Sequence, residues 1–469
     1  MSTEKTKGEL LKEKLSLDRE NSGILMSEEA QKTAFLFCES YKDFLDKAKT
    51  EREAVEYFLP IVKENGYKEF DPKAKYQAGD KVFYNNRGKA LIIATIGEKS
   101  MSEGVKILAS HIDSPRIDLK PCPLYEQGQI ALFKTHYYGG IKKYQWTALP
   151  LSLHGVIIKK NGEKIKVSIG EKDDEPVFCI SDLLPHLANE QMGRKLKDGI
   201  KGEELNVWAG ITPYNDEKVT EKVKLNILSI LNEKYGITES DFLSSDLCFV
   251  PSLKAKDVGF DRSMVGAYGH DDRVCAYTSM MAAIEAENAE YTHVTVITDK
   301  EETGSDSNTG LNSAYLKYFI ANLVATEGIE ARTVLSKSRC LSADVSVAFD
   351  PTFPEVTEKN NTAYLNYGVC IVKYTGARGK GDTSEATAEF MAYVRNILDK
   401  KDVIWQTGEL GKVDEGGGGT VAKYIAALDV DVVDVGVPVI SMHSPFEIVS
   451  KNDVFMTYRA FKEFLLDEE

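Results

Sequence analysis

The chain has 469 residues, of which 42% are hydrophobic and 28% are charged, and this ordinary balance excludes a disordered or fibrous protein. Its formal net charge of −15 disfavours nucleic acid and anionic membrane surfaces as partners. The longest apolar runs fall well short of the ~20 residues of a membrane span, and the N-terminus lacks the apolar stretch of a secretory signal.

The first hundred residues contain both helical and strand patterns. Residues 29–48 and 50–66 place apolar side chains three and four positions apart, which predicts two amphipathic helices. Residues 81–86, 90–98 and 105–113 are short β-rich runs bounded by Gly and Asn, which predicts three strands.

The pattern changes over residues 121–255. Residues 151–171 predict a hairpin around Asn161 and Gly162, because this turn pair tolerates positive φ. A charged stretch broken by glycines follows the hairpin. We therefore expect an inserted β-rich domain at 121–255 that interrupts a catalytic domain formed by 1–120 and 256–469.

Strand and helix patterns alternate again from residue 256. The predicted strands are 293–298, 342–350 and 431–447. The predicted helices are 271–289, 311–325, 384–400 and 453–469. The helix at 384–400 begins with Ser384, a residue suited to capping. This alternation predicts an α/β fold with a mainly parallel sheet that is covered on both faces.

Seven cysteines are spread widely along the chain, and none belongs to a CxxC pair. An odd number of isolated cysteines is typical of reduced, mostly buried thiols. We therefore expect a cytoplasmic protein without a zinc–cysteine site.

Histidines and carboxylates follow the predicted strands. His111 ends one strand, and Asp113 lies two positions on, where its carboxylate can orient the imidazole as metal sites commonly require. Glu301 and Glu302 follow the strand at 293–298. Sites in open parallel sheets form at the carboxyl ends of strands, so one of these glutamates can bind a metal while the other stays free as a general base. Each residue alone also fits an ordinary strand end or solvated turn.

Two adjacent acids, Asp271 and Asp272, begin a predicted helix, where the helix dipole alone favours negative charge. The functional alternative is an aspartate whose two oxygens bind different cations. The complete candidate set is His111, Asp271, Glu301, Glu302, Asp344 and His443. Imidazoles and carboxylates without a thiolate suit zinc, cobalt or manganese, and the number of ligands suits two ions that share one aspartate.

Seven segments extend these candidates over most of the chain. They are SHIDSPRIDLKP from Ser110, YYGG from Tyr137, DDR from Asp271, DKEETGS from Asp299, SADVSVAFDP from Ser342, EGGGGT from Glu415 and DVGVPVISMHSPFE from Asp434. In this order they resemble the M18 metallopeptidases, the aspartyl aminopeptidase and aminopeptidase I family. The resemblance implies a dinuclear-metal aminopeptidase that removes N-terminal residues, acidic ones among them, from peptides. It also implies a β-rich lid and dimerisation domain and a homododecamer built from dimers.

The resemblance also assigns roles to single residues. It implies that the metal ligands are His111, Asp271, Glu302, Asp344 and His443, with two divalent ions per subunit and zinc as the first choice. Asp271 would bridge the ions, Asp113 would orient His111, and Glu301 would be the general base. A cis peptide bond between Asp271 and Asp272 is expected as well.

Some positions depart from the common family pattern. After Gly140 the chain reads IKKYQWTALPLSLHG where a segment like LWHTWFDRDL is common, and Phe446 stands where an Arg is frequent. The lid offers one histidine, His186, where members specific for acidic residues often carry two. His186 and Lys373 are the candidates for substrate binding, His186 in a neighbouring subunit's active site and Lys373 against an acidic side chain. These departures leave acidic and neutral substrates open.

Other functions share the same ligands. Metal-dependent acylases, deacetylases and carboxypeptidases use this constellation, and a self-assembling shell with an inactive metal site is a non-enzymatic alternative. A requirement for a free α-amine separates an aminopeptidase from the other enzymes. The complete ligand set favours an enzyme over a shell.

Overall fold

Strands from both ends of the chain meet in one large sheet. The computed structural model describes residues 5–469, in which a nine-stranded sheet has the order β1-β2-β3-β13-β4-β14-β18-β16-β17. Its strands are β1 (Lys68–Glu69), β2 (Lys81–Asn86), β3 (Ala90–Thr95), β4 (Lys106–His111), β13 (His293–Thr298), β14 (Arg339–Ser342), β16 (Val369–Val372), β17 (Trp405–Thr407) and β18 (Asp431–Gly436). The central strands β13, β4, β14 and β18 pair in parallel, whereas β3 and β16 pair with this core antiparallel.

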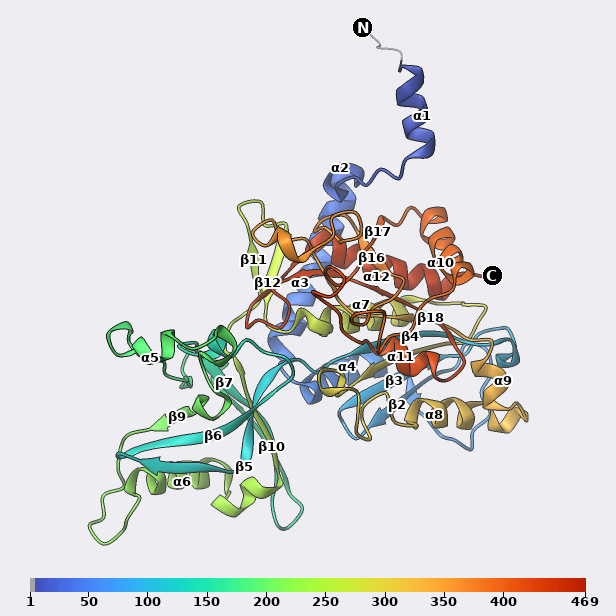
Figure 1. Ribbon diagram of the computed structural model, residues 1–469. Coiled ribbons are helices and arrows are strands. Elements are labelled where there is room, and N and C mark those ends of the chain that lie inside the picture. The colour runs from blue at the N-terminus through green and yellow to red at the C-terminus, as the bar shows by residue number, and fades with distance from the viewer. Residues whose placement is uncertain (1–4) are drawn as a thin grey trace.

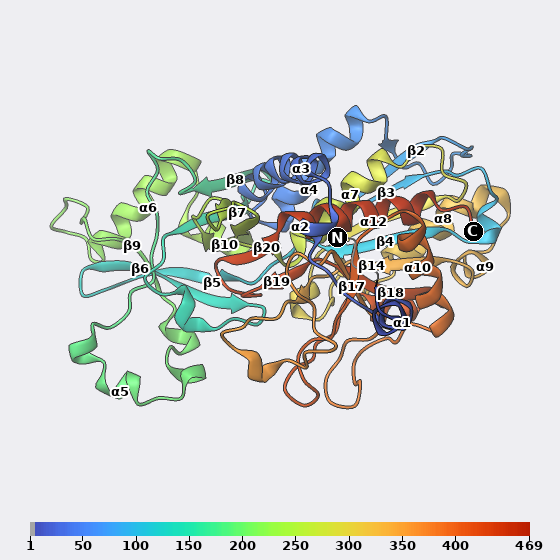
Figure 2. The same ribbon diagram turned by 90° about the horizontal axis from the view of Figure 1, so that it is seen from above.

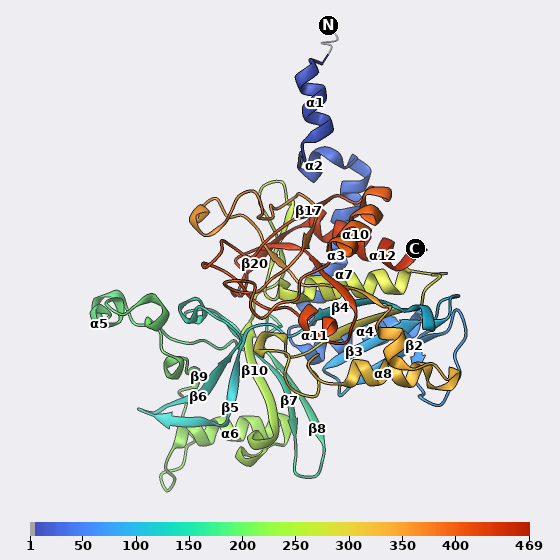
Figure 3. The same ribbon diagram turned by 45° about the vertical axis from the view of Figure 1, so that its right-hand side comes forward.

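Helices cover both faces of this sheet. Leu91 and Ile93 of β3 face one hydrophobic core with α3, α7 and α12, while Ile92 and Ala94 face a second core with α8 and α11. Alternate residues of a strand point to opposite faces, so two covered faces produce continuous apolar strands. Figure 3 shows α7 and α12 on one side of the sheet and α8 on the other. The predicted α/β fold with a mainly parallel sheet is confirmed.

The helices differ widely in length. They are α1 (Lys7–Leu15), α2 (Ser22–Leu25), α3 (Glu28–Lys47), α4 (Glu51–Glu64), α5 (Asn189–Met192), α6 (Lys222–Tyr235), α7 (His270–Glu285), α8 (Tyr315–Val324), α9 (Ala331–Leu335), α10 (Ala388–Lys400), α11 (Ala422–Ala426) and α12 (Lys451–Leu466). Both amphipathic helices expected near the N-terminus are confirmed as α3 and α4. In the described chain, no helix is both long and apolar enough to cross a membrane.

A second, antiparallel sheet forms a separate lobe (Figures 1 and 2). It has six strands in the order β8-β7-β10-β5-β6-β9. They are β5 (Arg116–Gln127), β6 (Ile130–Tyr138), β7 (Leu151–Ile158), β8 (Lys164–Ile169), β9 (Val207–Gly210) and β10 (Ser245–Pro251). The predicted hairpin around Gly162 is confirmed as β7 and β8, and Gly162 has a φ of 85°.

A third sheet lies between the large sheet and the lobe and has the order β11-β12-β20-β19-β15. Its strands are β11 (Lys256–Val258), β12 (Met264–Ala267), β15 (Ser346–Val347), β19 (Pro438–Ile440) and β20 (Glu447–Ser450). The single strand predicted at 342–350 is wrong. The chain leaves the large sheet after Ser342 and enters the third sheet at Ser346, where the Ser346 N–H donates to the Val437 carbonyl.

The predicted cap Ser384 is also wrong. Helix α10 is capped by Thr387, whose hydroxyl accepts the N–H of Phe390 at 3.1 Å. Residues before the cap are held in extended pairing, because Glu385 bridges Tyr374 and the Ala386 N–H donates to the Lys373 carbonyl. A helix cannot begin until that pairing ends.

A buried ionic cluster joins the six-stranded sheet to α4. His154 of β7 lies with Nδ1 2.9 Å from Glu53 of α4 and with Nε2 3.1 Å from Glu171, which follows β8. Burial opposes a charge on His154, but the two carboxylates outweigh it and raise the pKa of His154. Contacts with His154, Lys49 and Lys254 hold the pKa of Glu171 near 2 despite burial.

The cluster predicts a pH-dependent stability. A raised His154 pKa stabilises the fold fully below its ordinary value of 6.5, and this contribution is lost as the pH rises through the folded pKa. We expect His154→Gln to lower the free energy of unfolding by about 1–3 kcal/mol at about pH 5.5, and by less at about pH 9. Urea unfolding of both proteins at equal metal concentration measures this, with the exposed His136→Gln as control. An effect that does not change with pH would mean that His154 is neutral in the folded protein.

Candidate metal centre

The candidate residues meet at the carboxyl ends of three adjacent parallel strands. Thr298 of β13 is level with His111 of β4, and Ser342 of β14 is level with Ala109. Glu301 comes three residues after the end of β13, and Asp344 comes two residues after the end of β14, so both lie near His111 at the end of β4. Asp271 begins α7, and His443 follows β19. The register of the sheet thus gathers residues from five distant segments.

Asp271 stands between the two imidazoles. Its Oδ1 lies 3.2 Å from His111 Nε2, and its Oδ2 lies 3.0 Å from His443 Nε2. The second carboxylate near His111 is Asp344, with Oδ1 at 3.8 Å from Nε2. Glu302 has the matching place near His443, with Oε2 at 3.6 Å from Nε2. The arrangement is two half-sites that share one aspartate.

Backbone carbonyls orient both imidazoles. His111 Nδ1 lies 3.0 Å from the Asp113 carbonyl, and His443 Nδ1 lies 2.8 Å from the Gly140 carbonyl. A carbonyl can only accept, so Nδ1 carries a proton in each ring, and Nε2 is the ring nitrogen that faces the carboxylates. The Asp113 carboxylate, which the sequence predicted in this role, also faces the ring, with Oδ1 3.4 Å from His111 Nδ1.

The Asp113 carboxylate also holds the loop that carries both glutamates. Its Oδ1 accepts the N–H of Glu301 at 3.1 Å, and its Oδ2 accepts the N–H of Glu302 at 3.2 Å. Tyr138 donates its hydroxyl to Oδ2 at 2.6 Å. Gly139, with a φ of 76°, leaves room here, because a Cβ at that position would lie 3.3 Å from Glu302 Oε2. The Tyr-Gly segment therefore shapes one wall of the centre.

Negative charge is concentrated in this buried space. Burial, together with the charges of Asp344, Asp113 and Asp271, raises the pKa of Glu301 to about 8 although His111 opposes the shift. Burial and the charge of Asp271 also raise the pKa of Glu302, and burial raises that of Asp344. Carboxylates in such a place keep protons unless cations replace them.

The donor set fits zinc. Two ligand atoms bound to one tetrahedral zinc lie roughly 3.4 Å apart, and the four contacts described above between imidazole and carboxylate atoms range from 3.0 to 3.8 Å. Asp271 Oδ1 and Glu302 Oε1 are buried and have no hydrogen-bond partner within residues 5–469. A buried anionic oxygen without a partner is costly, and a metal ion supplies the missing partner.

Asp272 is a further acid of the centre. It forms a second close set of donor atoms with His111 and Asp344, beside the set formed by His111, Asp271 and Glu302. Its Oδ2 accepts the His111 backbone N–H at 3.3 Å. The Asp271–Asp272 peptide bond is cis, as expected.

Sequence analysis missed Glu447. This fully buried residue of β20 accepts the N–H of Asp271 at 3.0 Å and the N–H of His443 at 2.7 Å. His443 has a φ of 64°, a conformation that non-glycine residues rarely adopt, so it needs this support. The only available signal was an acid four residues after His443, which is too common to point to a role.

The two substrate-binding candidates lie apart from the centre. His186 lies on the exposed 3-10 turn Pro185–Leu187 of the six-stranded lobe. Lys373 follows β16 and is 43% exposed, and its Nζ lies 3.5 Å from Glu385. Neither residue forms a hydrogen bond or ion pair with the metal-centre residues in the part of the chain that the structure describes.

A pocket of about 690 Å³ opens beside His443. Its walls include Tyr137, Tyr144, Phe353 and Met442, with Lys142 and Lys143 among the polar residues. Pockets of this size with a mainly apolar wall and a few polar groups are typical of small-molecule and peptide sites. The pocket lies next to the metal centre, because His443 is one of its lining residues.

Comparisons with known proteins agree with this architecture. Residues 44–465 match the protein family described as Aminopeptidase I zinc metalloprotease (M18). A Clostridium acetobutylicum protein named Probable M18 family aminopeptidase 1 is 49% identical over 442 residues, which cover 92% of this chain and 95% of that protein.

Two solved structures share the whole fold. The crystal structure of aminopeptidase I from Clostridium acetobutylicum matches with a TM-score of 0.92 and 45% identity, over 97% of this chain and 100% of that one. The structure of the M18 family aminopeptidase from Thermotoga maritima matches with a TM-score of 0.91 and 44% identity, over 96% and 99% of the two chains.

The fold and the cluster of donors at its strand ends define a zinc metalloprotease of the aminopeptidase class. The chain belongs to the M18 family, the aminopeptidase I zinc metalloproteases, because the match spans most of its length. The family resemblance of the sequence motifs is thereby confirmed.

Glu447 offers a test of how the centre is held. We expect Glu447→Ala to weaken zinc binding roughly 10- to 100-fold, because it frees the backbone of Asp271 and His443 without removing a ligand. Competition against a coloured zinc chelator measures this affinity, and Glu389→Ala on the exposed side of α10 is the control. Unchanged affinity would show that the Glu447 hydrogen bonds do not orient the ligands.

Proposed function

We propose that this aminopeptidase binds two zinc ions and uses Glu301 as the general base to hydrolyse the first peptide bond of its substrates. The observation that carries the proposal is Asp271, whose two oxygens face two different imidazoles. His111, Asp271 and Asp344 would hold one ion, and Asp271, Glu302 and His443 the other. The ions, when bound, would polarise the scissile carbonyl and lower the pKa of a coordinated water.

Glu301 is suited to move the proton. Its Oε2 lies 3.9 Å from His111 Nε2, against 3.2 Å for Asp271, and Glu301 belongs to neither close donor set found among residues 5–469. Its side chain is 17% exposed, which leaves it open to water. Glu301 would accept a proton from the attacking water and deliver it to the leaving amine. Asp113 would keep Glu301 and Glu302 in place through their backbone N–H groups.

The pocket beside His443 supports a preference for apolar N-terminal residues. An acidic preference was expected to use Lys373, but this lysine pairs with Glu385 and does not line the pocket. Aromatic and aliphatic side chains form most of the pocket wall, which favours an apolar substrate side chain. Lys142 and Lys143 are the cations that an acidic side chain would have to reach.

The inserted segment 121–255 would be the lid and dimerisation domain, and 1–120 with 256–469 the catalytic domain. All six strands of the lobe sheet fall between Arg116 and Pro251, close to the bounds of this segment, which supports the division. We infer a homododecamer built from dimers, in which His186 reaches the active site of a neighbour. Saccharomyces cerevisiae mApe1, described as a dodecamer, shares the fold with a TM-score of 0.73 at 22% identity.

A cytoplasmic location is part of the proposal. All seven cysteines are free, and five of them are buried. Reduced thiols are typical of cytosolic proteins.

Glu301→Gln tests the general base. The amide keeps the size of the side chain but cannot accept the proton, so kcat should fall roughly 10²- to 10⁴-fold while zinc content stays unchanged. The matched control is Glu302→Gln, which should lose zinc as well as activity. Both quantities are measured on the same protein by peptide hydrolysis and metal analysis. Should Glu301→Gln retain most of the activity, another residue would have to be the base.

A set of amides tests the substrate. We expect the leucine amide to be cleaved with a higher kcat/KM than the aspartate amide, because the pocket wall is mainly apolar. N-acetylated versions should not be cleaved at all. Cleavage of the acetylated set would point to an acylase or endopeptidase instead, and faster cleavage of the aspartate amide would point to Lys142 and Lys143 as its partners.

A further inference from the structure

The turn between β11 and β12 holds a phenylalanine ring in water. Phe260 has an exposed fraction of 113%, the largest value for any bulky apolar side chain within residues 5–469. Burying such a ring is worth about 1.5–3 kcal/mol. An isolated exposed phenylalanine is common, so the turn that presents it decides whether this one has a purpose.

This turn is rigid. Gly259 and Arg262 adopt positive φ values of 86° and 58°. Asp261 Oδ1 accepts the backbone N–H of Ser263 at 3.2 Å and its hydroxyl at 3.0 Å. Arg262 donates from Nε to Asp257 Oδ2 at 2.7 Å. A turn whose backbone is already held in place loses little backbone entropy on binding, so the tip is prepared for a partner.

Asp257 also anchors the base of the hairpin. Its Oδ1 lies 2.8 Å from Lys42 Nζ of α3 and 2.8 Å from Lys451 Nζ of α12. The hairpin is thus joined to two long helices of the core. These ion pairs fix the position of the hairpin relative to the core.

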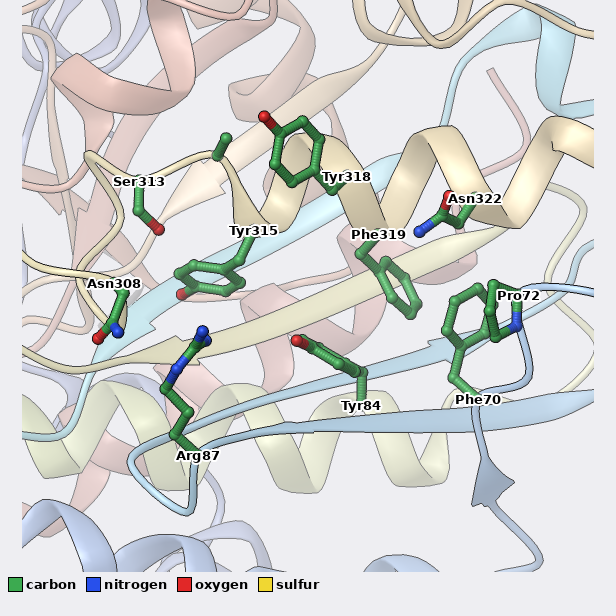
Figure 4. A pocket seen from close by; sticks show the side chains of 11 residues that line it. Phe70, Pro72, Tyr84, Arg87, Asn308, Ser313, Tyr315, Tyr318, Phe319 and Asn322 are labelled. Atoms are coloured by element: carbon green, nitrogen blue, oxygen red, sulfur yellow. The ribbon is translucent and has the colours of Figure 1, made fainter.

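An aromatic pocket lies at the far side of the large sheet. It has a volume of about 380 Å³ and lies between α8 and the β1–β3 edge. Figure 4 shows Tyr315 and Phe319 on α8 opposite Tyr84 and Phe70. An apolar cavity of about 150 Å³ already accommodates benzene, so this pocket has room for a phenyl ring.

The tip and the pocket also carry opposite charges. Arg87 lies at the pocket, where its side chain points toward Tyr315 (Figure 4). Its Nη1 donates to Asn86, and Arg87 pairs with no carboxylate in the described part of the chain. Beside Phe260, the Asp261 carboxylate is likewise without a cation partner among residues 5–469. The tip thus offers the Phe260 ring beside the Asp261 carboxylate. The pocket offers an aromatic wall beside the Arg87 guanidinium.

We propose that the Phe260 tip of one copy of this chain inserts into the aromatic pocket of a second copy, with Asp261 paired to Arg87. One chain cannot fill its own pocket, because the hairpin and α8 lie at opposite sides of the molecule in Figure 1. Tip and pocket are different surfaces, so the contact is heterologous, the kind that forms a ring where its rotation closes and a filament where it does not. The inference rests on the proposed assembly and names one contact that holds it.

The test uses the full, zinc-loaded chain. Phe260→Ala removes the ring, and Asn322→Trp fills the pocket from an exposed position on α8. Each variant should raise the concentration at which the largest species dissociates roughly tenfold or more, as measured by sedimentation velocity. Arg87→Glu should do the same, because it places a carboxylate opposite Asp261. Leu36→Ala, which trims a 71% exposed leucine of α3, should change nothing.

Mixing the two variants gives the decisive result. Phe260→Ala keeps its pocket and Asn322→Trp keeps its tip, so only the mixture can form this contact. With one variant labelled by a fluorophore, the mixture should contain labelled species larger than either variant forms alone. Variants that were merely unstable would not rescue each other.

Three outcomes would overturn the contact: Phe260→Ala assembling like the parent chain, a mixture no larger than its components, or Leu36→Ala dissociating equally. Hydrolysis of the leucine amide on the same samples keeps the proposed function separate. An assembled parent chain that is inactive would count against the mechanism and leave the contact standing. An active parent chain that stays monomeric would overturn the contact and leave the mechanism standing.

Discussion

The chemistry of this protein depends on negative charge that the fold confines to a buried space. Parallel register between β13, β4 and β14 brings carboxylates from separate segments around two imidazoles. Burial and mutual repulsion raise the pKa of Glu301 and Glu302. Cations relieve that repulsion, because a bound metal takes the place of the retained protons. Folding, proton uptake and metal binding are therefore linked at this centre.

Hydrogen bonds to backbone N–H groups hold the residues of the metal centre in position. Glu447 holds the N–H groups of Asp271 and His443, and Asp113 holds those of Glu301 and Glu302. These two acids bind no metal in the proposed arrangement, and they orient three other acids and one histidine of the centre. Glu447 is also opposite Ala267 of β12, the strand that follows the Phe260 turn and precedes Asp271. The assembly contact and the metal centre therefore share one small sheet.

Much of this could be predicted from the chain alone. Helices and strands with clear periodicity were predicted, and most candidate ligands were recognised because they lie in or just after a β-rich run, whereas Asp271 was recognised at the start of a predicted helix. The features that could not be predicted share one cause: they depend on contacts between distant segments. Glu447 looks like any acid in a short strand, and nothing in the sequence shows that the Asp113 carboxylate also accepts the N–H groups of Glu301 and Glu302. Ser384 likewise has a hydroxyl that could cap a helix, but α10 begins only after Thr387.

By itself the sequence determined the fold class, the family and the inventory of residues able to bind zinc, since these depend on local pattern and residue type. Tertiary structure alone decided that Asp271 faces both imidazoles, that carbonyls of Asp113 and Gly140 orient the rings, and that Lys373 pairs with Glu385. The physical reason is distance along the chain. Contacts between segments hundreds of residues apart depend on strand register and packing, which no local pattern records.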